Sequence, residues 1–375
     1  MREITADLAV IGAGSAGLSA AYQAACAGAD VLVIDENHLP GGQLFKQIHK
    51  FFGSRAHRAG TRGYQIGQEL LARVEQSGAR VWLDTLVYGM ERDKSLGVIH
   101  DGMHYVVRAK KVIVATGAKE NYMAFPGSTL PGVMGAGAAQ TMANVNRVLP
   151  GKRIVMLGSG NVGLIVSYQL MQAGAEVVAL VEGAPKIGGY AVHAAKLRRA
   201  GVPIYVGHTI TRVEGDGQVE RVEIAAVDKQ FQPIAGTEQM LEADTVCLAV
   251  GLNPMTELIW MAGCEFCFIP AFGGHVPLHD ANMETTVPGL YVAGDVTGVE
   301  EASSAMEEGN LAGVCAAQAL GLLSAEQADA KKAEITARLD ALRAGLFGER
   351  RRTAKQQQLD AMQAYRAQGG KDHVG

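Results

Sequence analysis

The chain has 375 residues, which is long enough for two domains and a tail. Hydrophobic residues make up 48% of it, a share that supports sizeable cores and argues against disorder. Its 34 basic and 38 acidic residues leave a net charge of −4, so nothing indicates binding to nucleic acid or to an anionic membrane. The first residues show no signal-peptide pattern and no apolar run is long enough to cross a bilayer, so we expect a cytoplasmic protein.

A glycine-rich turn opens the chain. An apolar run over 8–11 leads directly into the fingerprint Gly-Ala-Gly-Ser-Ala-Gly over 12–17, and a second apolar run over 31–34 ends in Asp35 and Glu36. In such a βαβ unit the first glycine makes the tight turn, the second leaves room for a pyrophosphate, and the third lets helix and strand pack. The acid at the end of the second strand accepts ribose hydroxyls, so this unit predicts a dinucleotide site.

Short extended segments follow the first unit. We expect a helix over 63–76 and then an antiparallel meander, because turn residues separate three extended runs at 81–90, 96–100 and 104–108. A buried strand over 112–115 comes next and ends in Thr116 and Gly117. Small residues there let the backbone lie over a bound nucleotide.

The second half repeats this order. The fingerprint Gly-Ser-Gly-Asn-Val-Gly over 158–163 follows an apolar run over 154–157, and the next strand ends in Glu182. We predict a helix over 192–200 and strands over 204–206, 210–213, 219–227 and 245–250, the last of which ends at Gly251. Each fingerprint has its full strand–turn–helix–strand–acid context, which favours two dinucleotide sites over two structural glycine turns.

A third buried strand, over 290–293, ends in Gly294 and Asp295 and precedes a helix over 300–320. We interpret it as the first domain resuming after the second was inserted. The predicted fold class is α/β, with two Rossmann-like (three-layer ββα) dinucleotide-binding domains, the second inserted in the first, and a helical C-terminal tail. The predicted boundaries are 1–122 with 270–322 for an FAD-binding domain, 123–269 for an NAD(H)-binding domain with linkers, and 323–375 for the tail.

Two dinucleotides in one chain indicate a flavoprotein that passes hydride between nicotinamide and FAD. We expect no catalytic side chain, because the cofactors carry the chemistry, and no metal site, because the histidines lack metal-like spacing. The Glu182 carboxylate would repel a 2′-phosphate, which favours NAD(H), although Lys186 lies close and NADP or ATP stay open. The residues expected at this second site are Gly158, Gly160, Asn161, Val162, Gly163, Glu182 and Gly251.

At this point the chain resembles the two-dinucleotide-binding-domain flavoproteins, the group that contains thioredoxin reductase. The resemblance covers residues 4 to about 320 and rests on both fingerprints, Pro-Gly-Gly-Gln-Leu over 40–44, Ala-Thr-Gly over 115–117 and Tyr-Val-Ala-Gly-Asp over 291–295. It implies that Asp295 hydrogen-bonds the ribityl chain of FAD and that a helix N-terminus at 300–303 points at the flavin ring. The residues expected to bind FAD are Gly12, Gly14, Ser15, Ala16, Gly17, Asp35, Glu36, Gly42, Gln43, Leu44, Ala115, Thr116, Gly117, Gly294, Asp295, Ala302 and Ser303.

A narrower resemblance lies in the segments 115–120, 125–134 and 136–140. They are similar to the α subunits of sarcosine oxidase, opine oxidase, hydrogen cyanide synthase and dye-linked proline dehydrogenase. That resemblance implies that a second flavoprotein subunit takes hydride from the C–N bond of an amino acid or amine, while this chain handles the electrons. The alternative is an ordinary Pro/Gly linker between domains.

The cysteines depart from both groups. Thioredoxin reductases carry a reactive Cys-x-x-Cys in the nicotinamide domain, whereas residues 123–245 hold no cysteine, so we do not expect disulfide reduction. No cysteine cluster for an iron–sulfur centre is present, so any such centre would belong to another polypeptide. Cys264 and Cys267 have the spacing of a redox pair, but we interpret them as structural thiols in a loop.

The tail contains a predicted helix. Ser324 and Gln327 fit a capping box, and Ile335, Leu339, Leu342 and Leu346 form an apolar stripe at helical spacing. Two interpretations stay open: a helix packed on its own domain, and an arm that docks on a partner subunit.

Three functions are compatible with these features. The leading hypothesis is an FAD-dependent, NAD(H)-linked oxidoreductase that forms the electron-handling subunit of a multisubunit amino-acid or amine dehydrogenase. Its partners would be a second flavoprotein subunit, together with an iron–sulfur subunit where such a centre is needed. The alternatives are a stand-alone NADH-dependent reductase of a small electron carrier, and a non-catalytic nucleotide-binding scaffold whose second site is empty or holds ATP.

Overall fold

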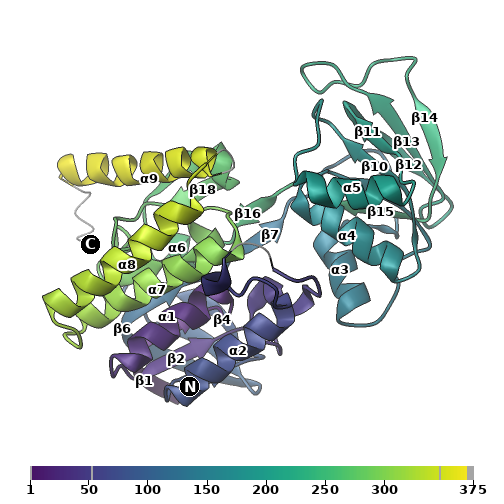
Figure 1. Cartoon of the computed structure of the whole chain (residues 1–375). Coiled ribbons are helices and arrows are strands. Elements are labelled where there is room, and N and C mark those ends of the chain that lie inside the picture. The colour runs from purple at the N-terminus through teal and green to yellow at the C-terminus, as the bar shows by residue number, and fades with distance from the viewer. Residues whose placement is uncertain (1, 52–53, 346–347, 370–375) are drawn as a thin grey trace. The chain divides into compact units, whose positions relative to one another are not determined.

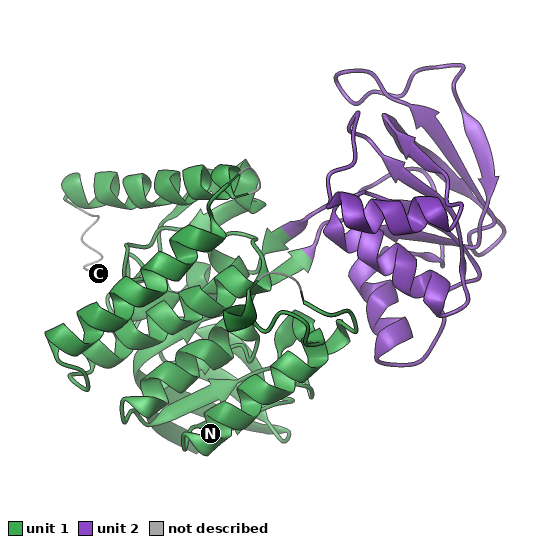
Figure 2. Ribbon diagram, viewed as in Figure 1, with its two compact units in different colours: residues 1–119, 253–375 green, residues 120–252 purple. Residues whose placement is uncertain are grey.

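The computed structural model of the chain describes residues 2–51, 54–345 and 348–369. It forms two compact units, unit 1 (Met1–Lys119 with Asn253–Gly375) and unit 2 (Glu120–Leu252), which Figure 2 shows in different colours. Unit 2 is inserted in the chain of unit 1, in agreement with the predicted fold class.

Unit 1 is built on a sheet of strand order β3-β2-β1-β6-β5-β4, with β19 also paired to β6 (Figure 1). Its strands are β1 (Arg2–Ile11), β2 (Val31–Ile34), β3 (Arg80–Trp82), β4 (Leu86–Met90), β5 (Leu96–His100), β6 (Met103–Val114) and β19 (Leu290–Val292). The strands β3, β2, β1, β6 and β19 run parallel, and β4 and β5 continue from β6 as an antiparallel meander.

Helices cover one face of this sheet. They are α1 (Ser15–Cys26), α2 (Gly63–Gln76), α7 (Ala302–Ala319) and α8 (Ala325–Leu342). The further helices and short strands of unit 1 are α6 (Glu257–Met261), α9 (Glu349–Ala367), η1 (Gly42–Lys46), η2 (Arg55–His57), η3 (Pro270–Phe272), η4 (Gly294–Thr297), β17 (Phe266–Ile269) and β18 (Gly274–Pro277). The chain crosses between the units as β7 (Ala118–Glu120) and β16 (Leu252–Pro254).

Alternating side chains of the central strands build two separate cores. In β1, Leu8 and Val10 join the core under the helices, whereas Ala9 and Ile11 join the core under the meander and α6. This is the period of two that a strand buried on both faces requires. The helices, the parallel sheet and the meander with α6 thus form three layers.

Unit 2 has the same three-layer plan. Its parallel sheet, in the order β11-β10-β9-β15-β8, is covered by helices on one face and by the antiparallel strands β12-β13-β14 on the other. The elements are β8 (Val133–Gly135), α3 (Ala136–Asn144), β9 (Arg153–Leu157), α4 (Asn161–Gln172), β10 (Glu176–Glu182), α5 (Ala191–Arg199), β11 (Ile204–Val206), β12 (His208–Glu214), β13 (Arg221–Ala226), β14 (Gln239–Glu242) and β15 (Thr245–Leu248). The predicted ββα layering is confirmed.

The boundary predicted at residue 270, which assigned the linkers to the second domain, differs from the division into compact units, in which unit 1 resumes at Asn253. Residues 253–269 are predicted in the second domain, but Ile259 and Ala262 are buried in the meander-side core of unit 1. In β17, Phe266–Ile269 pairs with β18, also in unit 1. The apolar side chains of this segment decide its membership.

Two predicted strand boundaries also differ. The runs at 104–108 and 112–115 form one strand, β6, which pairs with β1 from Arg2–Tyr105 to Ile11–Val114. Lys110 does not break it, because its ammonium points outward and lies 2.7 Å from the Asp7 carboxylate. The run at 81–90 is instead split into β3 and β4, where Asp84 takes a positive φ of 50°.

The tail packs on unit 1 rather than standing apart from it. The capping box of α8 is present, since Gln327 N donates to Ser324 Oγ and Ser324 N donates to Gln327 Oε1. Ile335 and Leu339 are buried in the helix-side core. Leu342 is half-buried, and Leu346 lies outside the described residues. The final helix, α9, lies within the predicted helical tail, although no pattern in the sequence marked its bounds. Among the described residues, no helix combines the length and the apolar character needed to span a bilayer.

Candidate dinucleotide sites

The first fingerprint forms the turn between β1 and α1. A Cβ on Gly12, whose φ is +107°, would overlap the carbonyl oxygen of Ala115, and a Cβ on Gly17 would overlap that of Gly12. At Gly14 the nearest atom to such a Cβ is Gly42 Cα, at 3.9 Å. The outer glycines therefore let the backbone pack closely, whereas the middle glycine has room for a Cβ without overlap.

The second fingerprint repeats this geometry in unit 2. A Cβ on Gly158 (φ +105°) would overlap the carbonyl oxygen of Ala249, and one on Gly163 would overlap that of Gly158. No atom lies within 4 Å of a Cβ placed on Gly160. The two turns share the same distribution of tight and open positions.

In both units the middle glycine of the fingerprint lies at the N-terminus of the helix that follows. Gly14 is the N-cap of α1 and Gly160 is the N-cap of α4, and no described side chain caps either helix. The next predicted residues, Ser15 and Ala16 in α1 and Asn161 and Val162 in α4, supply the first backbone N–H groups. N–H groups at the positive end of a helix dipole suit a diphosphate, so both turns fit the dinucleotides expected of them.

The predicted ribose-binding acids also hold the turns in shape. Asp35 Oδ2 accepts a hydrogen bond from Ala13 N at 2.5 Å, and Glu182 Oε2 accepts one from Ser159 N at 2.9 Å. The other carboxylate oxygen of each accepts from the backbone N–H two residues further along, at 2.8 Å in both. Asp35 is buried, whereas Glu36 is exposed. No pattern in the sequence indicates this supporting role.

A second glycine pair completes each turn. Gly41 N donates to the Ala13 carbonyl oxygen at 2.8 Å, and Gly189 N donates to the Ser159 carbonyl oxygen at 2.8 Å. Gly188 and Gly189 were not predicted at the site, although they follow their acid as the glycines at 41–42 follow theirs. The internal repeat therefore extends further along the chain than the fingerprints alone.

Three predicted FAD residues lie in η1. Gly42 has a φ of +55°, and a Cβ there would be 2.9 Å from Gly14 Cα, so a larger residue would crowd the turn. Gln43 is exposed, and the side chain of Leu44 is buried in the helix-side core. Only the backbone of Leu44 is therefore available to a ligand.

Strand ends form the next part of each site. Ala115 is buried, and Thr116 Oγ1 donates to the Met255 carbonyl oxygen at 2.7 Å, so its hydroxyl is used within the protein. Gly117 has a φ of +74° and Gly251 in unit 2 has a φ of +104°. Both need the left-handed backbone that glycine adopts most readily.

The turn at Gly294 and Asp295 lies against the first fingerprint. A Cβ on Gly294 would be 2.8 Å from Ala16 Cβ, so the two motifs meet in unit 1. Burial, followed by the nearby carboxylates of Glu308 and Glu300, raises the pKa of Asp295 to about 7. The remaining predicted residues, Ala302 and Ser303, begin α7.

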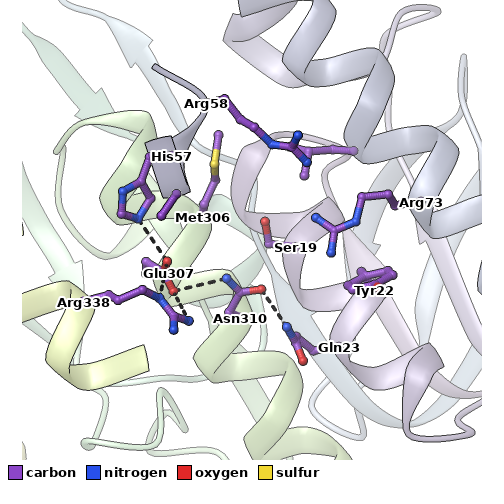
Figure 3. Close-up of a pocket in the computed structure, with 12 residues that line it drawn as sticks. Ser19, Tyr22, Gln23, His57, Arg58, Arg73, Met306, Glu307, Asn310 and Arg338 are labelled. Atoms are coloured by element: carbon purple, nitrogen blue, oxygen red, sulfur yellow. Dashed lines mark hydrogen bonds and ion pairs between the residues drawn. The ribbon is translucent and has the colours of Figure 1, made fainter. Parts of the chain in front are cut away.

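A separate polar pocket lies among α1, η2, α2, α7 and α8 (Figure 3). Arg338 donates to both oxygens of the buried Glu307 carboxylate, at 2.8 and 2.9 Å, and His57 Nε2 lies 3.0 Å from it. Burial alone would raise the pKa of Glu307, but Arg338 together with hydrogen bonds from Asn310 and His57 offsets this and holds the pKa below its usual range. These groups satisfy one another, so we interpret the cluster as a tether for α8.

The cysteines offer no reactive pair. Cys267 lies in β17 rather than in the predicted loop, because its backbone pairs with Val276 of β18. Burial raises the pKa of both Cys264 and Cys267, and it raises the pKa of Cys247 to about 12. Thiol–disulfide exchange needs a thiolate, which these environments disfavour. Within the described ranges, no group of three or more His, Cys, Asp or Glu is arranged to hold a metal ion.

Residues 6–309 match the family described as pyridine nucleotide-disulphide oxidoreductase, and the chain belongs to this family of oxidoreductases. The A subunit of opine oxidase from Agrobacterium tumefaciens (strain Ach5) is 33% identical over 343 residues, which cover 85% of this chain and 67% of that protein. The HcnB subunit of hydrogen cyanide synthase from Pseudomonas aeruginosa is 25% identical, over 93% of this chain and 80% of its own length. The alpha subunit of sarcosine oxidase from Corynebacterium sp. (strain P-1) is 27% identical over 84% of this chain, which spans 33% of that protein.

Solved structures agree on the fold. Thioredoxin reductase of T. acidophilum superposes with a TM-score of 0.69 at 23% identity, covering 84% of this chain and 98% of that one. L-Proline dehydrogenase of P. horikoshii superposes with a TM-score of 0.68 at 23% identity, covering 89% of this chain and 59% of that one. Both resemblances predicted from the sequence are thereby confirmed.

Proposed function

We propose that this chain is an FAD-dependent, NAD(H)-linked oxidoreductase, and that it is the electron-handling subunit of a multisubunit amino-acid or amine dehydrogenase. Unit 1 would hold FAD and unit 2 would hold NAD(H). The bound cofactors would supply hydride transfer. The chain's own residues would bind the two diphosphates, orient the rings and exclude water.

The repeated turn is the observation that carries this proposal. In both units the middle glycine opens onto an uncapped helix N-terminus, and an acid at the end of the next strand braces the turn. A turn that served only to pack a helix would not need open space at the middle position. Two such turns support two dinucleotides, which a hydride-transferring flavoprotein requires.

Glu182 supports NAD(H) over NADP(H) at the second site. Its carboxylate accepts hydrogen bonds from Ser159 N, Ser159 Oγ and Ala184 N, which fix a negative charge at the end of β10. A 2′-phosphate placed there would meet that charge, whereas a ribose hydroxyl would donate to it.

The names of the relatives support a role within a larger assembly, because the opine oxidase, hydrogen cyanide synthase and sarcosine oxidase relatives are each named as subunits. We propose a second flavoprotein as the partner that oxidises the amino acid or amine. An iron–sulfur centre, where one is needed, would be held by a further chain. The buried thiols argue against disulfide reduction, despite the family description. We further propose that the assembly works in the cytoplasm.

A matched pair of variants tests the two sites. Gly14→Val and Gly160→Val each add a branched side chain to one turn. A Cβ at either position meets no atom closer than 3.9 Å, and neither glycine has a positive φ. We expect Gly14→Val to lose bound FAD, since the branched side chain blocks the diphosphate. Gly160→Val should keep FAD but lose the bleaching of its visible band by NADH under anaerobic conditions.

Wild-type protein provides the control in both measurements. FAD retention by folded Gly14→Val, or NADH bleaching that survives in Gly160→Val, would show that the corresponding turn is not the binding site. Wild-type protein that binds no flavin would reject the proposal as a whole. Addition of candidate amino acids with and without the co-purified partner then tests the subunit role, and reduction without the partner would contradict it.

A further inference from the structure

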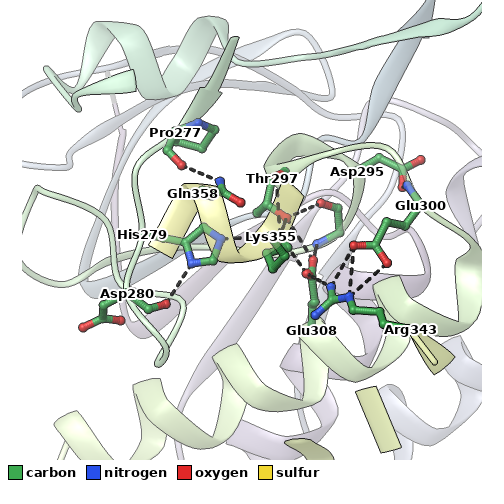
Figure 4. A network of polar contacts seen from close by, with 11 residues as sticks. Pro277, His279, Asp280, Asp295, Thr297, Glu300, Glu308, Arg343, Lys355 and Gln358 are labelled. Carbon is green, nitrogen blue, oxygen red and sulfur yellow. Dashed lines mark hydrogen bonds and ion pairs between the residues drawn. The ribbon is translucent and has the colours of Figure 1, made fainter. Parts of the chain in front are cut away.

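The α7 helix carries a buried carboxylate that faces the predicted flavin turn on one side and the tail helices on the other (Figure 4). Glu308 Oε2 accepts hydrogen bonds from Gly294 N and from Thr297 Oγ1, both at 3.0 Å. Glu308 Oε1 accepts from Arg343 at 2.6 Å and lies 2.9 Å from Lys355 Nζ. One carboxylate thus joins η4 to two cations from the C-terminal part of the chain.

Lys355 enters this cluster from α9. It is 6% exposed, and its ammonium contacts four atoms: Glu308 Oε1 and Thr297 Oγ1, both at 2.9 Å, and the Thr297 carbonyl oxygen and His279 Nε2, both at 3.5 Å. His279 donates Nδ1–H to the Asp280 carbonyl oxygen, which leaves Nε2 as the acceptor. Burial and the neighbouring Lys355 lower the pKa of His279 to about 4, so the ring is neutral and accepts from the ammonium.

Arg343 enters from the end of α8. Its guanidinium donates to Glu308 and also to both oxygens of Glu300, at distances from 2.8 to 3.2 Å for the Glu300 contacts. Glu300 N in turn donates to Asp295 Oδ1 at 3.3 Å. Arg343 therefore links Glu308, which accepts from Gly294 N, to Glu300, whose backbone N–H donates to the predicted ribityl-binding Asp295.

Stability alone does not account for this arrangement. Burial of two cations and their carboxylates costs desolvation energy, and apolar residues of similar volume often stabilise a core as well or better. What charged hydrogen bonds provide is a fixed direction for each partner. Here the two cations fix the orientation of the Glu308 carboxylate, and that carboxylate in turn fixes the Gly294 N–H and the Thr297 hydroxyl that donate to it.

We propose that Lys355 and Arg343 are positioning residues of the FAD site, which hold Glu308 so that it fixes the Gly294–Thr297 turn and with it Asp295. This inference rests on the proposed assignment of FAD to unit 1. It makes α8 and α9 part of the cofactor site, although neither lies in the segment that carries the fingerprints. It also gives the tail a role within this chain that differs from docking on a partner.

The Lys355→Met variant tests the proposal in the full-length protein. Methionine keeps much of the side-chain length but removes the charge and all three donors. We expect the dissociation constant for FAD to rise by about tenfold or more, with a changed shape of the visible flavin band, since the turn against the ring loses its fixed position. The control is Arg352→Met on the same helix, whose side chain is exposed and pairs with Glu349. It should bind FAD as the wild type does.

A second pair removes one hydroxyl rather than a charge. Thr297→Val deletes the group that contacts both Glu308 and Lys355, and Thr297→Ser keeps it. We expect valine to weaken FAD binding and serine to restore most of the affinity and the wild-type flavin spectrum. This pair decides the question if Lys355→Met does not fold, as judged by circular dichroism.

The outcomes separate this inference from the function on which it rests. Wild-type protein that fails to bind FAD rejects the assignment of the site itself. The positioning role is rejected if the wild type binds FAD and the folded variants bind it equally well. This means that Thr297→Val, and Lys355→Met if it folds, show a dissociation constant within about twofold of the wild type and an unchanged flavin spectrum. Equal losses in Thr297→Val and Thr297→Ser would also overturn it, because the hydroxyl would then be irrelevant.

Discussion

The three glycines of the first fingerprint meet different requirements, although they look alike in the sequence. Gly12 and Gly17 are required by backbone that lies too close for any side chain, and Gly12 also by its φ of +107°. Gly14 has an ordinary extended backbone, and a Cβ on it would come no closer than 3.9 Å to any other atom. Its requirement therefore concerns the ligand rather than the fold.

Alanine substitutions should separate these two requirements. In apo-protein, we expect Gly12→Ala to lower the free energy of unfolding by about 2 kcal/mol or more, because the new methyl meets the Ala115 carbonyl oxygen at a positive φ. Gly14→Ala should change it by less than about 1 kcal/mol. Urea denaturation of both variants checks this, and equal losses would contradict the assignment.

At the scale of elements, the tail joins the rest of unit 1 through its helix α8, which packs against α7. Apolar contacts of Ile335 and Leu339 bury one side of α8, and the capping box at Ser324 begins it. Glu307 on α7 then binds Arg338 of α8 through both carboxylate oxygens. A helix that packs in this way need not be an arm for a partner.

The Glu307→Gln variant should destabilise the protein in a pH-dependent manner. The pKa of Glu307 is lowered in the folded state from a usual 4.5, so its stabilising contribution is full above about pH 4.5 and is lost as the pH falls through the folded value. Near pH 7 we expect a loss of about 2 kcal/mol, which shrinks in acid. Denaturation curves of wild type and variant, recorded near pH 7 and in acid, measure this loss of unfolding free energy.

A control lies on the same arginine. Glu334 is 4.0 Å from Arg338 but is 77% exposed, so Glu334→Gln should cost less than about 1 kcal/mol. A loss for Glu307→Gln that is the same in acid as near neutrality would contradict the ion pair as its cause.

At the scale of the whole molecule, unit 2 is an insertion whose two crossings are neighbours. Asn121 N donates to the Gly251 carbonyl oxygen at 3.0 Å within unit 2, and Met255 N donates to the Gly117 carbonyl oxygen at 2.9 Å within unit 1. Each unit has its own cores, three clusters in unit 1 and two in unit 2 among the described residues. The chain therefore enters and leaves unit 2 at adjacent points. The three cores of unit 1 contain no side chain from the described residues of unit 2.

Replacement of residues 120–252 by a short Gly/Ser linker tests this organisation. Because the two crossings are adjacent, we expect the shortened protein to fold and to retain FAD. It should show no NADH bleaching of the flavin, since the second fingerprint is gone. Visible absorbance and an anaerobic NADH titration measure both, and loss of FAD from a folded product would contradict independent sites.

The sequence by itself determined the two fingerprints, the inserted order and the family, because strand alternation, glycine spacing and acids at strand ends are local patterns. It also placed the capping box of α8. Only the tertiary structure decided that residues 253–269 belong to unit 1, that β6 runs unbroken past Lys110, and that Lys355 and Arg343 meet Glu308. These outcomes depend on contacts between residues far apart in the chain, which local sequence patterns do not record. In a polar helix such as α9, for example, a lysine that is buried looks the same in the sequence as one that is exposed.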